Sequence, residues 1–71
     1  MCIELFAQRL RKSLQINKVS QSELARRINK SQSVVNNYCS GEREPSLEVL
    51  VLICKALGES ADYLLGIDIE K

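Results

Sequence analysis

The stretch from residue 20 to residue 41 constrains the fold of this chain more than any other part of its sequence. Ser20 stands three residues before Glu23, which is the spacing of a capping box at the start of a helix. Asn29 tolerates the left-handed backbone conformation with which helices end. Ser31 is a residue type that caps a further helix. The stretch therefore predicts two short helices joined by a tight turn.

The two predicted helices present different side chains. In the first, Leu24, Ala25 and Ile28 fall on one face, which is typical of a helix packed on a core. In the second, Val35 and Tyr38 point one way, and polar side chains with several amides occupy the other positions. A helix, a sharp turn and a second helix with a polar face form the helix-turn-helix layout.

The same pattern of capping residues continues along the chain, with serines at expected helix starts and Asn or Gly at expected helix ends. No segment has a convincing strand period, although Ile67-Asp68-Ile69 alternates briefly. Asn17 is expected to stand just past the first helix, as Asn29 does past the second. The predicted helices cover about residues 3–16, 21–28, 32–40, 47–57 and 61–65. Five helices in so short a chain must pack as an all-α domain.

A length of 71 residues indicates one domain, covering residues 1–71. Its charge is unevenly distributed despite a net charge of +1. Met1 to Arg43 carries eight Lys/Arg and three Asp/Glu, a net charge of +5, whereas Glu44 to Lys71 carries two and six, a net charge of −4. The basic part coincides with the helix-turn-helix, where it can attract phosphates. We expect the acidic part, about residues 46–71, to be the pairing region.

An ordered set of residues resembles the phage-repressor and Cro type of helix-turn-helix domain, often called Xre-like. The resemblance covers roughly residues 6–65 and depends on the whole set rather than on any one tetrapeptide. The matching features are Ser20-Gln21, Glu23-Leu24-Ala25, Ser31 to Tyr38, Ser40-Gly41, Arg43, Pro45-Ser46-Leu47-Glu48, Leu50, Lys55-Ala56-Leu57-Gly58 and Asp62-Tyr63-Leu64-Leu65.

This resemblance implies a compact five-helix, lambda-repressor-like domain that binds operator DNA, usually as a two-fold dimer. Its third helix would lie in the major groove. The positions that match base-contacting sites are Gln32, Ser33 and Asn37, with Asn36 as a further candidate. The positions that match backbone-contacting sites are Gln21, Ser31, Ser40 and Arg43.

The chain departs from the family pattern at several positions. Asn29 replaces a common Gly, which is a mild change, and Glu42 replaces a common basic residue, which weakens a phosphate contact. Leu14 and Cys39 together replace an Arg and a Glu that pair in the family. Because replacing both partners of an ion pair by apolar groups can be neutral or stabilising, we predict that these two side chains touch in the core.

The amides of the third predicted helix, residues 32–40, suit one kind of base. Asn and Gln side chains donate and accept at once, which matches the adenine edge in the major groove. No Arg or Lys lies between Gln32 and Gly41, so this helix cannot make bidentate guanine contacts. We therefore expect A·T pairs at one or more central positions of the half-site.

The fourth predicted helix is apolar almost all round. Its expected inward stripe is Leu47, Leu50, Ile53, Cys54 and Leu57, and the other side carries Val49, Leu52 and Ala56. An exposed aliphatic patch would mark a partner surface, unless residues 63–69 fold back and cover it. The residues expected on a dimer or partner surface are Val49, Leu52, Leu64, Leu65, Ile67 and Ile69. The sequence leaves open whether the tail pairs as a strand or extends a helix.

Several classes of protein do not fit the sequence. There is no His, no glycine-rich phosphate loop and no Cys-x-x-Cys pair, so we expect no enzyme, cofactor, metal or small-molecule ligand. The three cysteines are read as thiols in a reducing compartment. No apolar run approaches a membrane span and the start does not resemble a secretory signal, so we expect a cytoplasmic protein with no membrane partner.

The sequence thus favours a small regulator that binds double-stranded DNA, as a homodimeric repressor on a palindromic operator. The alternative is a protein-interaction module, such as an antitoxin or adaptor, that keeps the fold and uses Val49, Leu52 and the tail on another protein.

Overall fold

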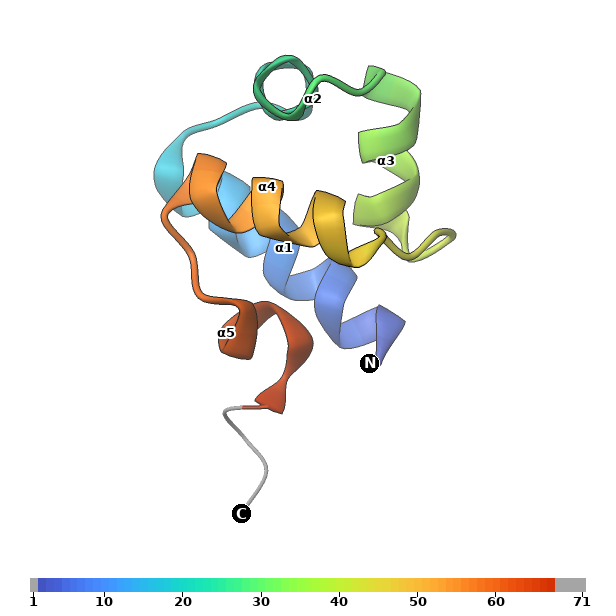
Figure 1. Ribbon diagram of the computed structural model, residues 1–71, viewed down its shortest axis with the longest axis vertical. Coiled ribbons are helices and arrows are strands. Elements are labelled where there is room, and N and C mark those ends of the chain that lie inside the picture. Colours follow the sequence, from blue (N-terminus) through green and yellow to red (C-terminus); the bar gives the residue numbers. More distant parts are fainter. Residues whose placement is uncertain (1, 68–71) are drawn as a thin grey trace.

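The computed structural model describes residues 2–67, and in this range the chain forms five helices and no strand. The helices are α1 (Ile3–Asn17), α2 (Gln21–Ile28), α3 (Gln32–Ser40), α4 (Leu47–Leu57) and α5 (Ala61–Leu65). The predicted all-α, five-helix architecture is confirmed. As Figure 1 shows, α4 runs alongside α1 in the middle of the molecule, α2 and α3 lie toward one end, and α5 lies at the other.

Serine caps define the starts of four of the five helices. The hydroxyl oxygens of Ser20, Ser31, Ser46 and Ser60 each accept a hydrogen bond from the backbone N–H three residues further on. A cap of this kind stabilises a helix by about 1 kcal/mol. α1 is the exception, because Cys2 precedes it and makes no side-chain cap.

The first helix ends one residue later than expected. Asn17 is still helical, and Lys18 takes the left-handed conformation, with φ 57° and ψ 42°. The side-chain amide of Asn17 donates to the carbonyl of Ser13, 2.8 Å away, inside the last turn of the helix. Asn29, by contrast, ends α2 in the left-handed conformation as predicted.

One hydrophobic core joins all five helices. Its members with no measurable exposure are Phe6, Leu10, Leu24, Val35, Ile53 and Leu64. Leu14 and Cys39 are 6% and 2% exposed and belong to the same core cluster. Their common burial fits the replacement of an ion pair by apolar groups, and their direct contact stays a prediction.

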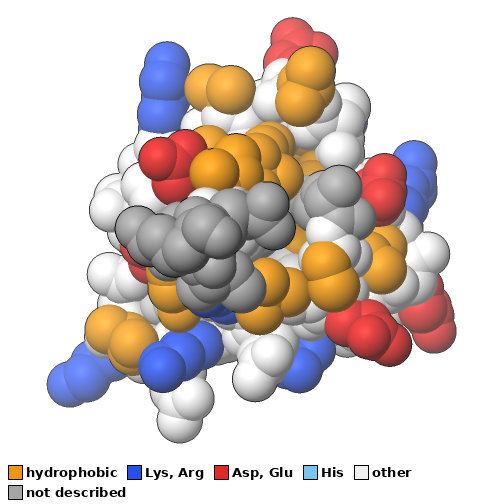
Figure 2. Space-filling view, turned by 90° about the horizontal axis from the view of Figure 1, so that it is seen from below, with side chains coloured by type: hydrophobic (Ala, Val, Ile, Leu, Met, Phe, Trp, Pro, Cys, Tyr) orange, Lys and Arg blue, Asp and Glu red, His pale blue; other side chains and the backbone are white. Residues whose placement is uncertain are grey.

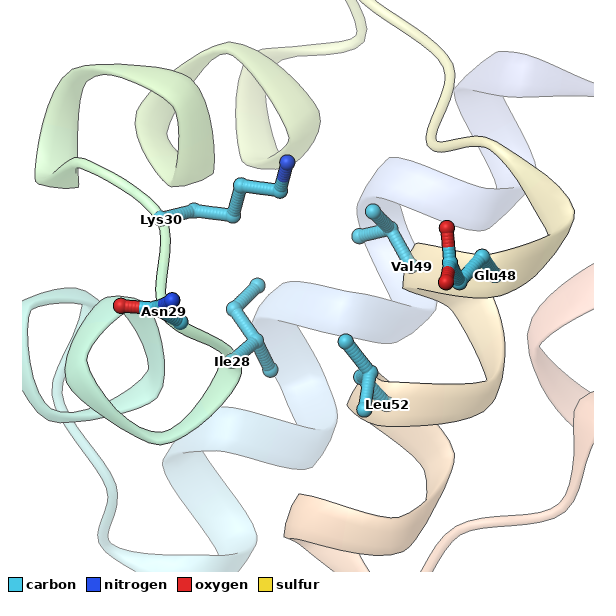
Figure 3. Close-up of a pocket in the computed structure, with 6 residues that line it drawn as sticks. All are labelled: Ile28, Asn29, Lys30, Glu48, Val49 and Leu52. Carbon is cyan, nitrogen blue, oxygen red and sulfur yellow. The ribbon is translucent and has the colours of Figure 1, made fainter.

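The buried face of α4 differs from the expected one. Leu47 was expected inside but is 81% exposed, whereas Val49 was expected outside and is 6% exposed. α4 packs against α2 as well as α1, so its buried side is turned toward α2. There Val49 lines the same hollow as Ile28 (Figure 3).

Three arginines tie helices together through backbone carbonyls. Arg9 donates to the carbonyl of Tyr63 at 2.5 Å, and its guanidinium lies 4.4 Å from the centre of the same tyrosine ring. Arg11 donates to the carbonyl of Cys39, and Arg27 donates to that of Ala56 at 3.0 Å. Each acceptor lies in the last turn of a helix, α5, α3 or α4, where positive charge is favourable. The carbonyl of Tyr63 also accepts from the backbone N–H of Gly66 at 3.2 Å.

Candidate nucleic-acid interface

α3 has one apolar and one polar side. Its inward side buries Val35, Tyr38 and Cys39. Its other side exposes Gln32, Ser33 and Asn36, while Asn37 is half-buried. Within residues 2–67, the side-chain amides of the three amide residues make no hydrogen bond to protein. These amides therefore remain available to donate to and accept from a binding partner.

The starts of α2 and α3 are also positioned to meet an anion. Gln21 and Gln32 occupy the first positions of these helices, where backbone N–H groups and the positive end of the helix dipole are concentrated. Ser31 is exposed, and its hydroxyl oxygen accepts from the N–H of Val34 at 3.2 Å. Since that role uses only the oxygen, the hydroxyl hydrogen of Ser31 can still be donated to a phosphate.

Ser40 and Arg43 lie at and beyond the end of α3, and both are exposed. The Ser40 hydroxyl donates its only hydrogen to the carbonyl of Asn37, 3.1 Å away. A phosphate oxygen can only accept, so Ser40 must break this bond to hold one. Arg43 stands between two exposed acidic residues, Glu42 and Glu44, in the loop before α4.

Part of the positive charge near the helix-turn-helix is paired with a carboxylate on the protein surface. Glu23 pairs with both Arg26 and Arg27, the latter at 2.9 Å. Hydrogen bonds from Arg26 and then Arg27 lower the pKa of the Glu23 carboxyl below its ordinary value. Arg11 and Arg27 also donate hydrogen bonds to backbone carbonyls at helix ends. The charge count of the sequence therefore overstates the number of side chains free to meet phosphates. The pairs with Glu23 are visible in the sequence as three- and four-residue spacings, whereas the carbonyl contacts carry no such signal.

The expected partner surface is only partly exposed. Val49 and Leu64 are 6% and 0% exposed, so placing them on a partner surface was wrong. Both point into the core instead, because α4 is turned toward α2 and α5 packs against α1. Leu65 is half-buried, Leu52 and Ile67 are exposed, and Ile69 lies outside the described residues. Two exposed apolar residues of α4, Leu47 and Val51, were not among those expected.

A shallow hollow of about 220 Å³ separates the α2–α3 turn from α4 (Figure 3). Ile28, Val49 and Leu52 give it apolar walls, and Lys30 and Glu48 stand on its two sides. Val49 and Leu52, two of the residues expected on a partner surface, both line this hollow.

Residues 2–67 form neither a candidate metal site nor a candidate membrane span. No group of three or more His, Cys, Asp or Glu is arranged to hold a metal ion in this range. No helix in the same range has the length and apolar character needed to cross a membrane.

The comparisons with known proteins agree with this geometry. The profile of the helix-turn-helix family matches residues 7–64. The uncharacterized HTH-type transcriptional regulator YobD of Bacillus subtilis (strain 168) is 30% identical over 63 residues. That alignment covers 89% of this chain and 56% of the relative, so the chain spans a little over half the relative's length. No solved structure matches this chain significantly. Since the profile covers most of the chain, this chain belongs to the helix-turn-helix family, of the Xre/Cro-like type.

Proposed function

We propose that this chain is a transcriptional regulator that binds double-stranded DNA in a sequence-specific manner. The observation that carries the proposal is the polar side of α3, where exposed amides stand on a helix whose other side is fixed in the core. A helix of this kind enters the major groove, and its amides match the adenine edge. The relative's name, a transcriptional regulator, supports the same function.

The proposed contacts divide into two kinds. Gln32, Ser33, Asn36 and Asn37 contact base edges and select the sequence. The DNA backbone is contacted by Gln21, Ser31, Ser40 and Arg43, which set the position of the domain. At protein–DNA interfaces, backbone contacts generally position the protein and base contacts select the sequence. Ser31 is better suited to its role than Ser40, because its hydrogen is free.

We further propose that two copies pair and bind a palindromic operator. By occupying the operator, the dimer would repress transcription of the genes it controls. A single small domain makes few contacts, and a two-fold dimer doubles them on half-sites about 34 Å apart. Figure 2 shows apolar side chains gathered on the face at the α5 end, with charged side chains around them. Leu65 and Ile67 from this end are the proposed pairing residues within the C-terminal region. Leu52, a further candidate, lies beside the α2–α3 turn.

The pairing can be tested by sedimentation of the wild-type protein and an Ile67→Glu variant. Ile67 is 52% exposed, so a charge there is tolerated by the monomer. A wild-type dimer that dissociates in the variant supports pairing at this end. A wild-type monomer at all concentrations, alone and on DNA, contradicts the dimer.

DNA binding can be tested by selecting duplexes from a random pool and titrating the selected duplex in a mobility-shift assay. A regulator prefers one short palindrome over random duplex. Its log affinity falls with log salt by about 0.9 for each phosphate neutralised. The rival interaction module, favoured by the hollow beside Leu52, shows neither sequence preference nor this salt dependence.

A further inference from the structure

The C-terminal end of α3 is tied to α1 by one arginine. Arg11 projects from α1, and its guanidinium donates a hydrogen bond to the backbone carbonyl of Cys39, in the last turn of α3. Carbonyls at this position have no partner further along the helix. Arg11 therefore supplies from another helix the partner that α3 itself lacks.

Other contacts place this end of α3 on the same side of α1. Ala7 lies one helical turn before Arg11, and a methyl group at Gly41 would lie 3.7 Å from the Cβ of Ala7. Ala7, Arg11 and Ser40 also line a common surface hollow of about 360 Å³. The arginine thus spans a junction at which the two helices already approach closely.

The neighbouring carbonyls are satisfied within α3 and the turn that follows it. The carbonyl of Asn37 accepts from the N–H of Glu42 at 3.0 Å, and that of Tyr38 accepts from the N–H of Gly41 at 3.3 Å. Among residues 2–67, the bond from Arg11 is the one hydrogen bond that joins α3 to α1. The rest of the α1–α3 contact is apolar packing, which is not directional, whereas a hydrogen bond restricts both distance and angle.

We infer that Arg11 is a positioning residue for base reading: it fixes the orientation of α3 and so directs the amides of Asn36 and Asn37. This inference rests on the proposed function. Both asparagines lie within one helical turn of Cys39, so a rotation of this end of α3 redirects their side chains. An asparagine reads adenine through two hydrogen bonds that must be aligned together, which makes the reading sensitive to such a rotation.

The test compares Arg11→Met with a matched control, Arg27→Met. Both changes keep the apolar stem, remove one positive charge and remove one donor to a helix-end carbonyl. Arg27→Met also removes the ion pair with Glu23 in α2, so it is the more disruptive change of the two. The acceptor of Arg27, however, is Ala56 in α4 and not a residue of α3. The measured quantity is the ratio of affinities for the duplex selected by the wild-type protein and for random duplex, at a temperature where circular dichroism shows each variant folded.

We expect Arg11→Met to lower this ratio roughly tenfold, the size expected when one amide–adenine contact in a half-site is partly lost. Arg27→Met should lower the thermal midpoint and leave the ratio unchanged, because loss of stability alone reduces binding to both duplexes equally. Arg11→Lys retains a donor and should restore part of the ratio. Amide hydrogen exchange at Glu42, whose N–H bonds to α3, should be faster in Arg11→Met than in Arg27→Met.

Three results would overturn the inference. An unchanged ratio in Arg11→Met would show that Arg11 does not position α3. A salt slope reduced by about 0.9, with both duplexes weakened alike, would show that Arg11 contacts a phosphate instead. An equal loss of ratio in Arg27→Met would show a general structural effect. A wild-type protein without any preferred sequence would overturn the proposed function itself, which separates that failure from the other three.

Discussion

The hydroxyl of Ser13 donates a hydrogen bond to a carboxylate oxygen of Glu59, 2.9 Å away. Ser13 lies in α1 and is 1% exposed, and Glu59 lies in the loop between α4 and α5. The amide of Asn17 in turn donates to the Ser13 hydroxyl oxygen at 3.2 Å. The hydroxyl therefore both donates and accepts, and it joins the end of α1 to the loop that leads into α5.

This contact should be detectable as a coupling between two substitutions. Glu59→Ala leaves a buried hydroxyl without its acceptor and should lower the free energy of unfolding by about 1–3 kcal/mol. When Ser13→Ala is already present, Glu59→Ala should lower the free energy of unfolding by less, because there is no longer a buried hydroxyl that loses its acceptor. Urea unfolding of the two single variants and the double variant measures this coupling, with Glu44→Ala as the control for loss of an exposed carboxylate. Additive effects would show that the contact contributes nothing.

A second prediction concerns Lys18, which adopts the left-handed conformation at φ 57°. A side chain in this region costs roughly 1–2 kcal/mol, a cost that glycine avoids. Lys18→Gly should therefore raise the thermal midpoint and the free energy of unfolding, by about 1 kcal/mol after the larger chain entropy of glycine is deducted. Asn29→Gly, at φ 61°, is the matched comparison and should gain less because asparagine tolerates this conformation. A destabilised Lys18→Gly would contradict the assignment of strain.

The helices could be predicted from the sequence because their signals are local. Ser20, Ser31, Ser46 and Ser60 stand one residue before the helices they cap, and the apolar spacing within each helix agrees with these starts. Lys18 gave no such signal, since lysine has no preference for the left-handed region. The end of α1 was consequently misplaced by one residue.

Contacts between distant residues could not be predicted in the same way. The buried face of α4 depends on where α2 lies, so Leu47 and Val49 were assigned to the wrong sides. The bonds from Arg9, Arg11 and Arg27 to helix-end carbonyls join residues 28 to 54 positions apart. No spacing in the sequence distinguishes such arginines from those that attract phosphates. The polar side of α3, in contrast, follows from its local pattern alone.

Asn37 and Arg43 should differ in the way they affect DNA binding. Asn37→Ala removes a proposed base contact, so it should cost about 1–3 kcal/mol at one base pair of each half-site and relax the preference there. Arg43→Ala removes a proposed phosphate contact, so it should weaken all sequences alike and reduce the salt slope. Mobility-shift titrations with the selected duplex and its single-base variants distinguish the two. If both variants weaken binding to random duplex equally, the two roles are assigned wrongly.

Ser31 and Ser40 form a further matched pair. Ser31→Ala should lower the free energy of unfolding by about 1 kcal/mol through loss of a cap. It should also weaken DNA binding at a temperature where the variant is folded, since its free hydrogen is lost. Ser40→Ala should weaken DNA binding less than Ser31→Ala does, because Ser40 must first give up its hydrogen bond to the carbonyl of Asn37 before it can hold a phosphate. A larger loss of affinity in Ser40→Ala than in Ser31→Ala would mean that Ser40 turns toward the phosphate on binding.

The cysteines should make stability fall with rising pH. Burial raises the pKa of the Cys39 thiol above its ordinary value of 9.0, partly offset by Arg11, and burial also raises the pKa of Cys54, with a further contribution from Glu59. The folded chain therefore holds these protons at pH values where the unfolded chain has released them. Their contribution to stability is complete below the ordinary thiol pKa and is lost as the pH rises through the folded-state values.

Urea unfolding from neutral to alkaline pH measures this effect. In Cys39→Ala the decline in stability should be shallower than in the wild-type protein, although the variant is less stable at every pH because of the cavity it creates. Cys2→Ala, which removes an exposed thiol, serves as the control for thiol removal. A Cys39→Ala profile parallel to that of the wild-type protein would show that this thiol does not titrate differently in the two states.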